Sequence, residues 1–202
     1  MHMSKMIGSV FVLLSTSLML WLLLKKDEAF FNLRDVIVSH FKVFEHCKTQ
    51  YIVFYVLPLM FAVGLSLLYE AGATFYSELS IILGILLSIL LAILAILCGY
   101  DFSGVKNQRQ KDRAKNVLKE TLNSIVFDSA LCLFMLLYDL VIVVLSDGTF
   151  NWLPFDIRLI KSIVSGVAYY IFLVILLTLL FIIKQMCKLI EFNLEAKRGD
   201  AQ

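Results

Sequence analysis

Two aspartates, Asp128 and Asp139, stand out because they interrupt an apolar stretch, residues 121–145, that has the length of a membrane-spanning helix. An ionised carboxylate is costly in hydrocarbon, so such residues usually face a bundle interior or a water-filled cavity, and they often mark an ion or proton path. Their spacing places both side chains on one helix face, about 16 Å apart along the axis. We therefore predict that both carboxyl groups point away from lipid and meet polar companions.

The aspartates belong to a polar stripe, because further side chains share their face of the predicted helix: Thr121, Ser124, Cys132, Met135 and Ser146. One interpretation is functional, with the stripe forming an ion or proton path or a seam where helices of an oligomer meet. The other is structural, with the carboxyl groups hydrogen-bonded to neighbouring helices so that they hold the bundle together. The candidate partners for such bonds are Tyr169, Tyr170, Ser165, Lys161 and Ser88.

The composition of the chain is that of a membrane protein. Of its 202 residues 60% are hydrophobic and 17% charged, and the mean hydropathy is +0.87. Five apolar stretches are long enough to cross a bilayer, and all but the fourth lack charged residues: 6–24, 51–69, 79–98, 121–145 and 162–183. The connectors between them are too short for a separate soluble domain. The sequence therefore predicts one all-α, polytopic membrane domain over residues 1–202.

The basic residues indicate how the chain is oriented in the membrane. The connector 70–78 contains no Lys or Arg, whereas the connector 99–120 contains Lys106, Arg109, Lys111, Arg113, Lys115 and Lys119. Because cytoplasmic loops are enriched in Lys and Arg, 99–120 is predicted to be cytoplasmic, together with 25–50 and the C-terminal 184–202. All 18 Lys and Arg residues then lie inside except Lys5, Arg158 and Lys161. A four-span alternative, with 6–24 lying along the inner surface, satisfies the same rule.

The three cytoplasmic segments are predicted to be helical. Residues 27–50 carry apolar side chains at helical spacing, as in a helix that lies on the inner leaflet or packs on a partner. Residues 105–119 should extend the next span, and 184–198 should continue the last one to a stop at Gly199. The basic cluster suits anionic lipid heads, an acidic protein face or a nucleic-acid backbone. Its one aromatic residue, Phe102, argues against sequence-specific nucleic-acid binding.

Small residues predict close helix packing at two places. Four of them recur at four-residue intervals in the third stretch, namely Ser80, Gly84, Ser88 and Ala92, and Ser162 and Gly166 repeat the spacing in the fifth. The pattern predicts helix association, and it leaves open whether the partner helix belongs to the same chain. Pro58 with Gly64 predicts a kink in the second stretch.

Motifs for catalysis or metal binding are not found in the sequence. The four cysteines, Cys47, Cys98, Cys132 and Cys187, stand singly and without His at ligand spacing. The sequence contains no HExxH motif or phosphate-binding glycine loop, and no arrangement typical of a catalytic triad. We therefore expect no enzyme activity, no metal and no cofactor.

The layout resembles the membrane subunit of the Kiwa anti-phage system of bacteria, on the basis of chain length, the N-terminal apolar segment, the basic connector Lys106–Lys119 and the tail Lys184–Arg198. The resemblance implies four spans and a homo-oligomeric sensor that recruits a cytoplasmic effector. We expect a non-enzymatic, multi-pass assembly subunit of the bacterial inner membrane, with a cytoplasmic C-terminus, that contacts lipids, other copies and a cytoplasmic protein. The alternative is a small ion or proton channel or transporter that uses Asp128 and Asp139.

Overall fold

The computed structural model describes residues 14–15, 17, 37–38, 40, 52–69, 71–99, 108–146 and 157–199. These residues are almost entirely helical and include no strand, which confirms the predicted all-α fold. The elements are a π-helix η1 (Ile52–Val56) and the α-helices α4 (Leu57–Leu68), α5 (Ala73–Cys98), α6 (Gln108–Ser146) and α7 (Ile157–Gly199). Apart from Leu14, Ser15 and Ser17, the predicted span 6–24 lies outside the described residues.

Three helices are long and apolar enough to cross a membrane: α5, α6 and α7. The apolar helix Ile52–Leu68 is shorter. With 39 and 43 residues, α6 and α7 are about 58 and 64 Å long at a rise of about 1.5 Å per residue. The hydrocarbon core of a bilayer is roughly 30 Å thick, so both helices must continue well beyond it.

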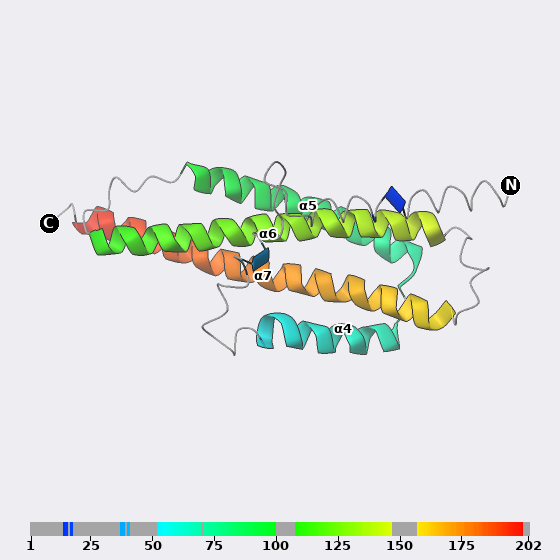
Figure 1. Cartoon of the computed structure of the whole chain (residues 1–202). Coiled ribbons are helices and arrows are strands. Elements are labelled where there is room, and N and C mark those ends of the chain that lie inside the picture. The colour runs from blue at the N-terminus through cyan, green and yellow to red at the C-terminus, as the bar shows by residue number, and fades with distance from the viewer. Residues whose placement is uncertain are drawn as a thin grey trace.

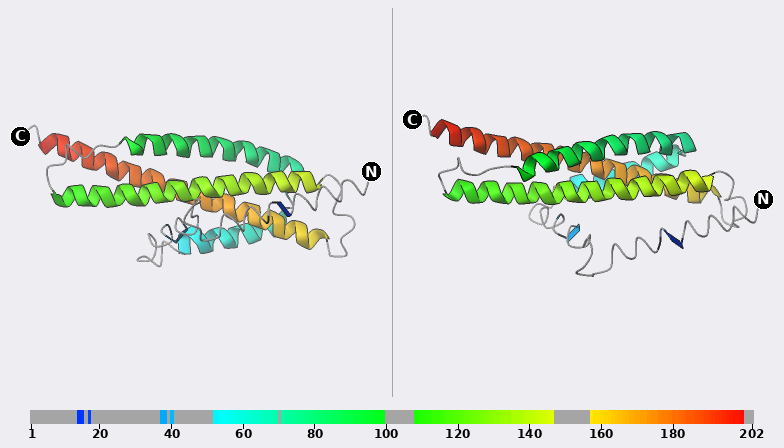
Figure 2. Two further views of the ribbon diagram at one scale, coloured as in Figure 1. Left: turned by 45° about the horizontal axis from the view of Figure 1, so that its top comes forward. Right: turned by 90° about the horizontal axis from the view of Figure 1, so that it is seen from above.

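The helices form an elongated bundle in which sequence neighbours run antiparallel (Figure 1). α6 packs against both α5 and α7, and α4 packs against α7. The rotated views show α5, α6 and α7 running alongside one another, with α4 covering only the first half of α7 (Figure 2). The described chain is therefore a three-helix bundle with one short helix on the side of α7.

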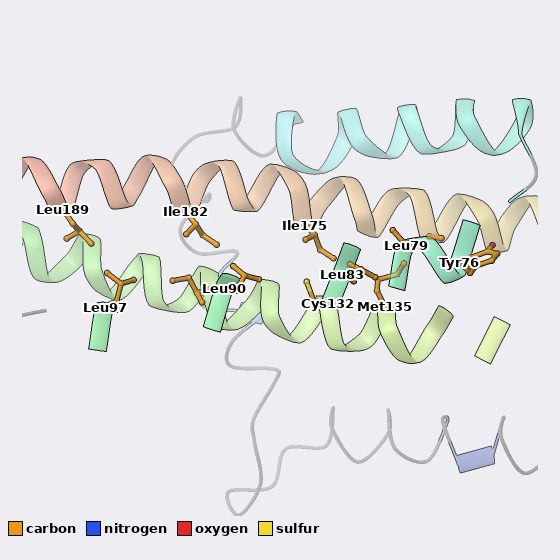
Figure 3. Packing of buried hydrophobic residues seen from close by; sticks show 12 residues of the cluster. Tyr76, Leu79, Leu83, Leu90, Leu97, Cys132, Met135, Ile175, Ile182 and Leu189 are labelled. Carbon is orange, nitrogen blue, oxygen red and sulfur yellow. The ribbon is translucent and has the colours of Figure 1, made fainter. Parts of the chain in front are cut away.

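The core of the bundle is a row of apolar residues that are spaced seven apart along α5 and α7 (Figure 3). The repeat is Leu83, Leu90 and Leu97 on α5 and Ile175, Ile182 and Leu189 on α7, and all six side chains are buried. Because seven residues make about two helical turns, such a repeat returns to the same face and produces a continuous seam between helices. On α6 the row contains Ile125, Cys132 and Met135.

The second apolar stretch changes its helix type next to Pro58, where the sequence predicts a kink. Pro58 lies in the first turn of α4, and the residues before it form the π-helix η1. A proline lacks the backbone N–H that a helix interior uses, so the first turn is the position that tolerates it. α4 continues through Gly64 without a break.

The first turns of α6 and the last turns of α7 run side by side past the end of α5 (Figure 1). We call this pair, residues 108–120 and 184–199, the stalk. A hydrogen bond of 3.3 Å from Gln185 Nε2 to Glu120 Oε2 links its two helices, and Ala114 and Leu189 are buried within it. From Gln108 onward, the structure confirms that the basic connector continues the next span as one helix, and that α7 extends to Gly199.

Candidate functional site

Asp139 is fully buried and has one polar companion on another helix. The Ser80 hydroxyl of α5 donates a 3.2 Å hydrogen bond to Asp139 Oδ2. The second carboxyl oxygen, Oδ1, has no hydrogen-bond partner in the described part of the chain. The next residue along α6, Tyr138, donates its hydroxyl to the backbone oxygen of Val164 on α7 at 2.9 Å. This end of α6 is thus connected to both neighbouring helices by side-chain hydrogen bonds.

Asp128 is also fully buried, but neither of its carboxyl oxygens has a hydrogen-bond partner among the described residues. It lies one helical turn from both Ser124 and Cys132 on the inward face of α6. The pairing of Glu120 with Gln185 sets an antiparallel register that brings Thr178 of α7 about level with Asp128. The Thr178 hydroxyl donates to its own helix, to the Val174 oxygen at 3.0 Å. Asp128 is therefore sheltered from lipid as predicted, but no polar companion for it lies among the described residues.

The rest of the predicted polar stripe faces inward as well. Thr121, Ser124, Cys132 and Met135 are all buried, whereas the side chain of Ser146 is not described. Thr121 donates its hydroxyl to Val117 O of the previous turn at 2.7 Å, which satisfies it locally. The two carboxyl groups are separated along α6 by the layers of Cys132 and Met135, both of which belong to the apolar core. The stripe is therefore a series of separate polar positions within an apolar interior.

The predicted partners of the aspartates have other contacts, so this part of the prediction was wrong. Ser88 is exposed and donates to Gly84 O of its own helix, and Lys161 is exposed. Ser165 accepts a hydrogen bond from the Ala71 N–H at 3.1 Å. The other two predicted partners pack against aromatic or apolar residues: Tyr169 against Phe75, and Tyr170 against the Tyr55–Val174 cluster. The physical reason is the register of α5, which places Ser80 opposite Asp139 and turns Ser88 about 80° away.

His40, which no sequence motif marks as functional, is buried against α6. Its Nδ1 lies 3.4 Å from the Ser124 Oγ, and its ring stacks on Phe127 with a centroid distance of 4.0 Å. Burial lowers the pKa of His40 from 6.5 to about 4, because the charged ring would lose its hydration. A signal was present in the sequence, since His40 follows Ile37 by three residues on the apolar face of the predicted 27–50 helix. Most of that segment lies outside the described residues.

The basic residues predicted to bind a partner or lipid lie on the stalk. Arg109, Arg113, Lys115 and Lys119 are exposed, Lys111 is half-buried, and Lys106 lies outside the described residues. The stalk segment of α7 adds two exposed lysines, Lys184 and Lys188. Among the acidic residues there, Asp112 accepts a hydrogen bond from Gln108, and Glu120 accepts one from Gln185. The described part of the stalk therefore presents a mainly basic surface that suits an anionic partner.

The two small-residue patterns have different surroundings. At Gly166 a Cβ atom would lie 3.3 Å from the Ser66 side chain, and Ser162 donates a 3.0 Å hydrogen bond to Ser66 O, so α4 and α7 approach closely there. At Gly84 a Cβ atom would meet nothing within 4 Å, and Ser88 and Ala92 are exposed. The described chain thus provides a packing partner for the fifth-stretch pattern but not for the Gly84–Ala92 face.

Comparison with known proteins adds no identification, because the chain matches no protein-family model, no curated protein and no solved structure. Within the described residues, no three or more His, Cys, Asp or Glu side chains gather as a metal ion would require. The candidate site therefore consists of two features of the chain itself, the buried polar stripe of α6 and the exposed basic stalk.

Proposed function

We propose that this chain is a non-enzymatic, homo-oligomeric assembly subunit of the bacterial inner membrane that recruits a cytoplasmic effector through its stalk. The observation that carries the proposal is the stalk itself, whose two helices run side by side past the end of α5 and are linked at its base by the hydrogen bond between Gln185 and Glu120. A rigid helical pair that projects from a membrane and exposes basic side chains is a docking surface for an acidic protein face.

The distribution of charged residues favours a docking role over a catalytic one. The exposed charges of α6 gather in its first three turns, while its two interior carboxyl groups lie in an apolar core. The stalk is too small to bury a catalytic pocket of its own. The stalk therefore serves to bind another protein, and the membrane spans hold it at the membrane surface.

The proposed role in anti-phage defence is supported by the resemblance to the Kiwa membrane subunit. That resemblance rests on the layout of the chain, and the stalk adds a physical means of recruitment. On this proposal the stimulus reaches the membrane part and the stalk transmits it to the effector.

Recruitment is tested by expressing the tagged chain with its genomic neighbours and purifying it in detergent. We expect a neighbour-encoded soluble protein to be retained on an oligomer of the chain. The double variant Arg113→Glu, Lys115→Glu should lose that protein, because it reverses the charge of the stalk surface. The matched control Lys161→Glu, at the opposite end of α7, should retain it. A monomeric mass with no neighbour retained by the unmodified chain would overturn the proposal.

A second function, an ion or proton path through the bundle, is favoured by one observation. The Asp128 carboxyl group is fully buried without a hydrogen-bond partner in the described structure, and such groups inside membranes often serve transport. The apolar layers of Cys132 and Met135 between Asp128 and Asp139 argue against a continuous path.

Flux measurements in liposomes distinguish this second function from the first. A path through the stripe requires that Asp128→Asn and Asp139→Asn each reduce proton or ion flux, while Asp112→Asn, at an exposed stalk position on the same helix, leaves it unchanged. If the unmodified chain gives no flux, or if the flux is unchanged in both Asp128→Asn and Asp139→Asn, the second function is ruled out.

A further inference from the structure

Helix α7 carries an exposed apolar stripe that the fold of the described chain leaves uncovered. The stripe consists of Leu180, Ile183, Cys187, Ile190 and Leu194. The exposed fractions of Ile190 and Leu194 are 54% and 55%. We call these five residues the α7 seam.

The spacing within the α7 seam is three, four, three and four residues, which is the repeat of a helix that packs along another helix. In this repeat Leu180, Cys187 and Leu194 occupy a positions, and Ile183 and Ile190 occupy d positions. Contact with lipid tails needs no such regularity. The seam also continues past Lys184 and Lys188, into the part of α7 where exposed charged residues stand beside the apolar ones.

The α7 seam is separate from the contact between α7 and α6. Gln185 and Leu189, which face α6, are buried, and the seam is centred about 160° away from them around the helix axis. α4 covers the first half of α7, while η1 contacts Phe181 through Phe54, so both leave the later part of the seam open. A second helix can therefore occupy the seam without displacing α6.

We propose that the α7 seam pairs in parallel with the α7 seam of a second copy of this chain. Two copies inserted in one membrane share their orientation, so their α7 helices run in the same direction and like positions of the repeat meet. The seam's flanking charges permit this pairing, since in a parallel pair Lys184 faces Leu179 of the other copy and Glu191 faces Met186. No like charges come together at these positions. The inference rests on the homo-oligomer of the proposed function and locates its contact.

The pairing is tested by disulfide formation in native membranes, because an a position brings two identical side chains close together across the pair. The chain contains its own reporter in Cys187, which is exposed and unpaired. Oxidation should convert the chain to a covalent species of twice its mass. Cys187→Ser should abolish that species, whereas Cys98→Ser, at the other exposed cysteine of the described helices, should leave it unchanged.

A scan of single cysteines separates seam pairing from random collision. In a background with Cys47, Cys98 and Cys187 replaced by Ser, Ile190→Cys and Leu194→Cys should cross-link. The matched controls Lys188→Cys and Glu191→Cys, on the same turns but outside the seam, should cross-link far less. Equal cross-linking at all four positions, no cross-linking at any, or cross-links only to a different protein would each overturn the proposal.

A variant with intact cysteines gives a second measurement. Replacing Ile190 and Leu194 by Ser should reduce the Cys187 disulfide, because the apolar contact on the C-terminal side of Cys187 is lost, while Lys188→Ser should not. If the purified chain is oligomeric but the seam positions do not cross-link, pairing through the α7 seam is wrong, while the proposed homo-oligomer is still supported. If the seam cross-links but no neighbour protein is retained, the pairing stands and recruitment fails.

Discussion

At the scale of single residues, the hydrogen bond between Ser80 and Asp139 is the clearest polar contact between α5 and α6. Side-chain hydrogen bonds between membrane helices contribute about 0.6 kcal/mol on average and up to about 1.7 kcal/mol. We expect Ser80→Ala to lower the free energy of unfolding in detergent by about that amount. The control is Ser88→Ala, because Ser88 is exposed and, in the described part of the chain, bonds to Gly84 O of its own helix. Equal losses for the two variants would contradict an interhelical role for Ser80.

For Asp128 we expect that removing the side chain does not destabilise the protein. A buried polar group without a partner costs about 1–3 kcal/mol, so Asp128→Ala should leave the free energy of unfolding unchanged or raise it. The comparison is Met135→Ala, two turns away in the apolar core, which should cost about 2–5 kcal/mol through the cavity that it leaves. Both values come from reversible unfolding in detergent. A large loss of stability for Asp128→Ala would mean that the carboxyl group has a stabilising partner.

The sequence predicted that the two aspartates of α6 are buried, but it did not predict which residues they contact. Asp128 and Asp139 were expected inside because a carboxylate is costly in lipid, and both are fully buried. Periodicity places residues on a face of one helix, yet it does not fix the register between two helices. Ser80 was therefore interpreted as part of a packing pattern, and Ser88 was proposed as a partner in its place. His40 was missed because its contact with Ser124 joins residues 84 positions apart.

At the scale of elements, the two glycine patterns predict different responses to a larger side chain. Gly166→Leu should lower the free energy of unfolding by about 1–3 kcal/mol, because the side chain must displace Ser66 and push α4 from α7. The control Gly84→Leu should leave it unchanged or raise it by up to about 1 kcal/mol, since that position is open and Leu is the better helix former. Thermal or denaturant unfolding in detergent measures both. A comparable loss at Gly84 would indicate that this face is covered.

The elements themselves followed from the sequence more closely than their ends did. The apolar stretches 121–145 and 162–183 mark the part of each helix that lipid would surround, whereas α6 begins at Gln108 and α7 ends at Gly199. Helical propensity and side-chain spacing continue past the last apolar residue, so counting apolar residues measures the span rather than the helix. In the second stretch Pro58 predicted a kink, whereas the π-helix that precedes it has no sequence signature of its own.

At the scale of the whole molecule, the antiparallel register requires that both helical extensions leave the membrane on the same side. Gln185 meets Glu120, so the start of α6 and the end of α7 lie together, and Lys161 lies at the opposite end of α7. The excess of Lys and Arg on the stalk predicts that this shared side is the cytoplasm.

Single cysteines in a background without Cys47, Cys98 and Cys187 test both statements, using the exposed positions Lys115→Cys, Lys188→Cys and Lys161→Cys. A membrane-impermeant maleimide applied to intact spheroplasts should label only the cysteine at 161, because the cytoplasmic stalk is then out of reach. In inverted vesicles it should label only those at 115 and 188. Labelling of 115 and 188 from opposite sides would contradict the antiparallel register. Labelling of both from outside would retain the register and reverse the orientation, and the proposed recruitment of a cytoplasmic effector would fail with it.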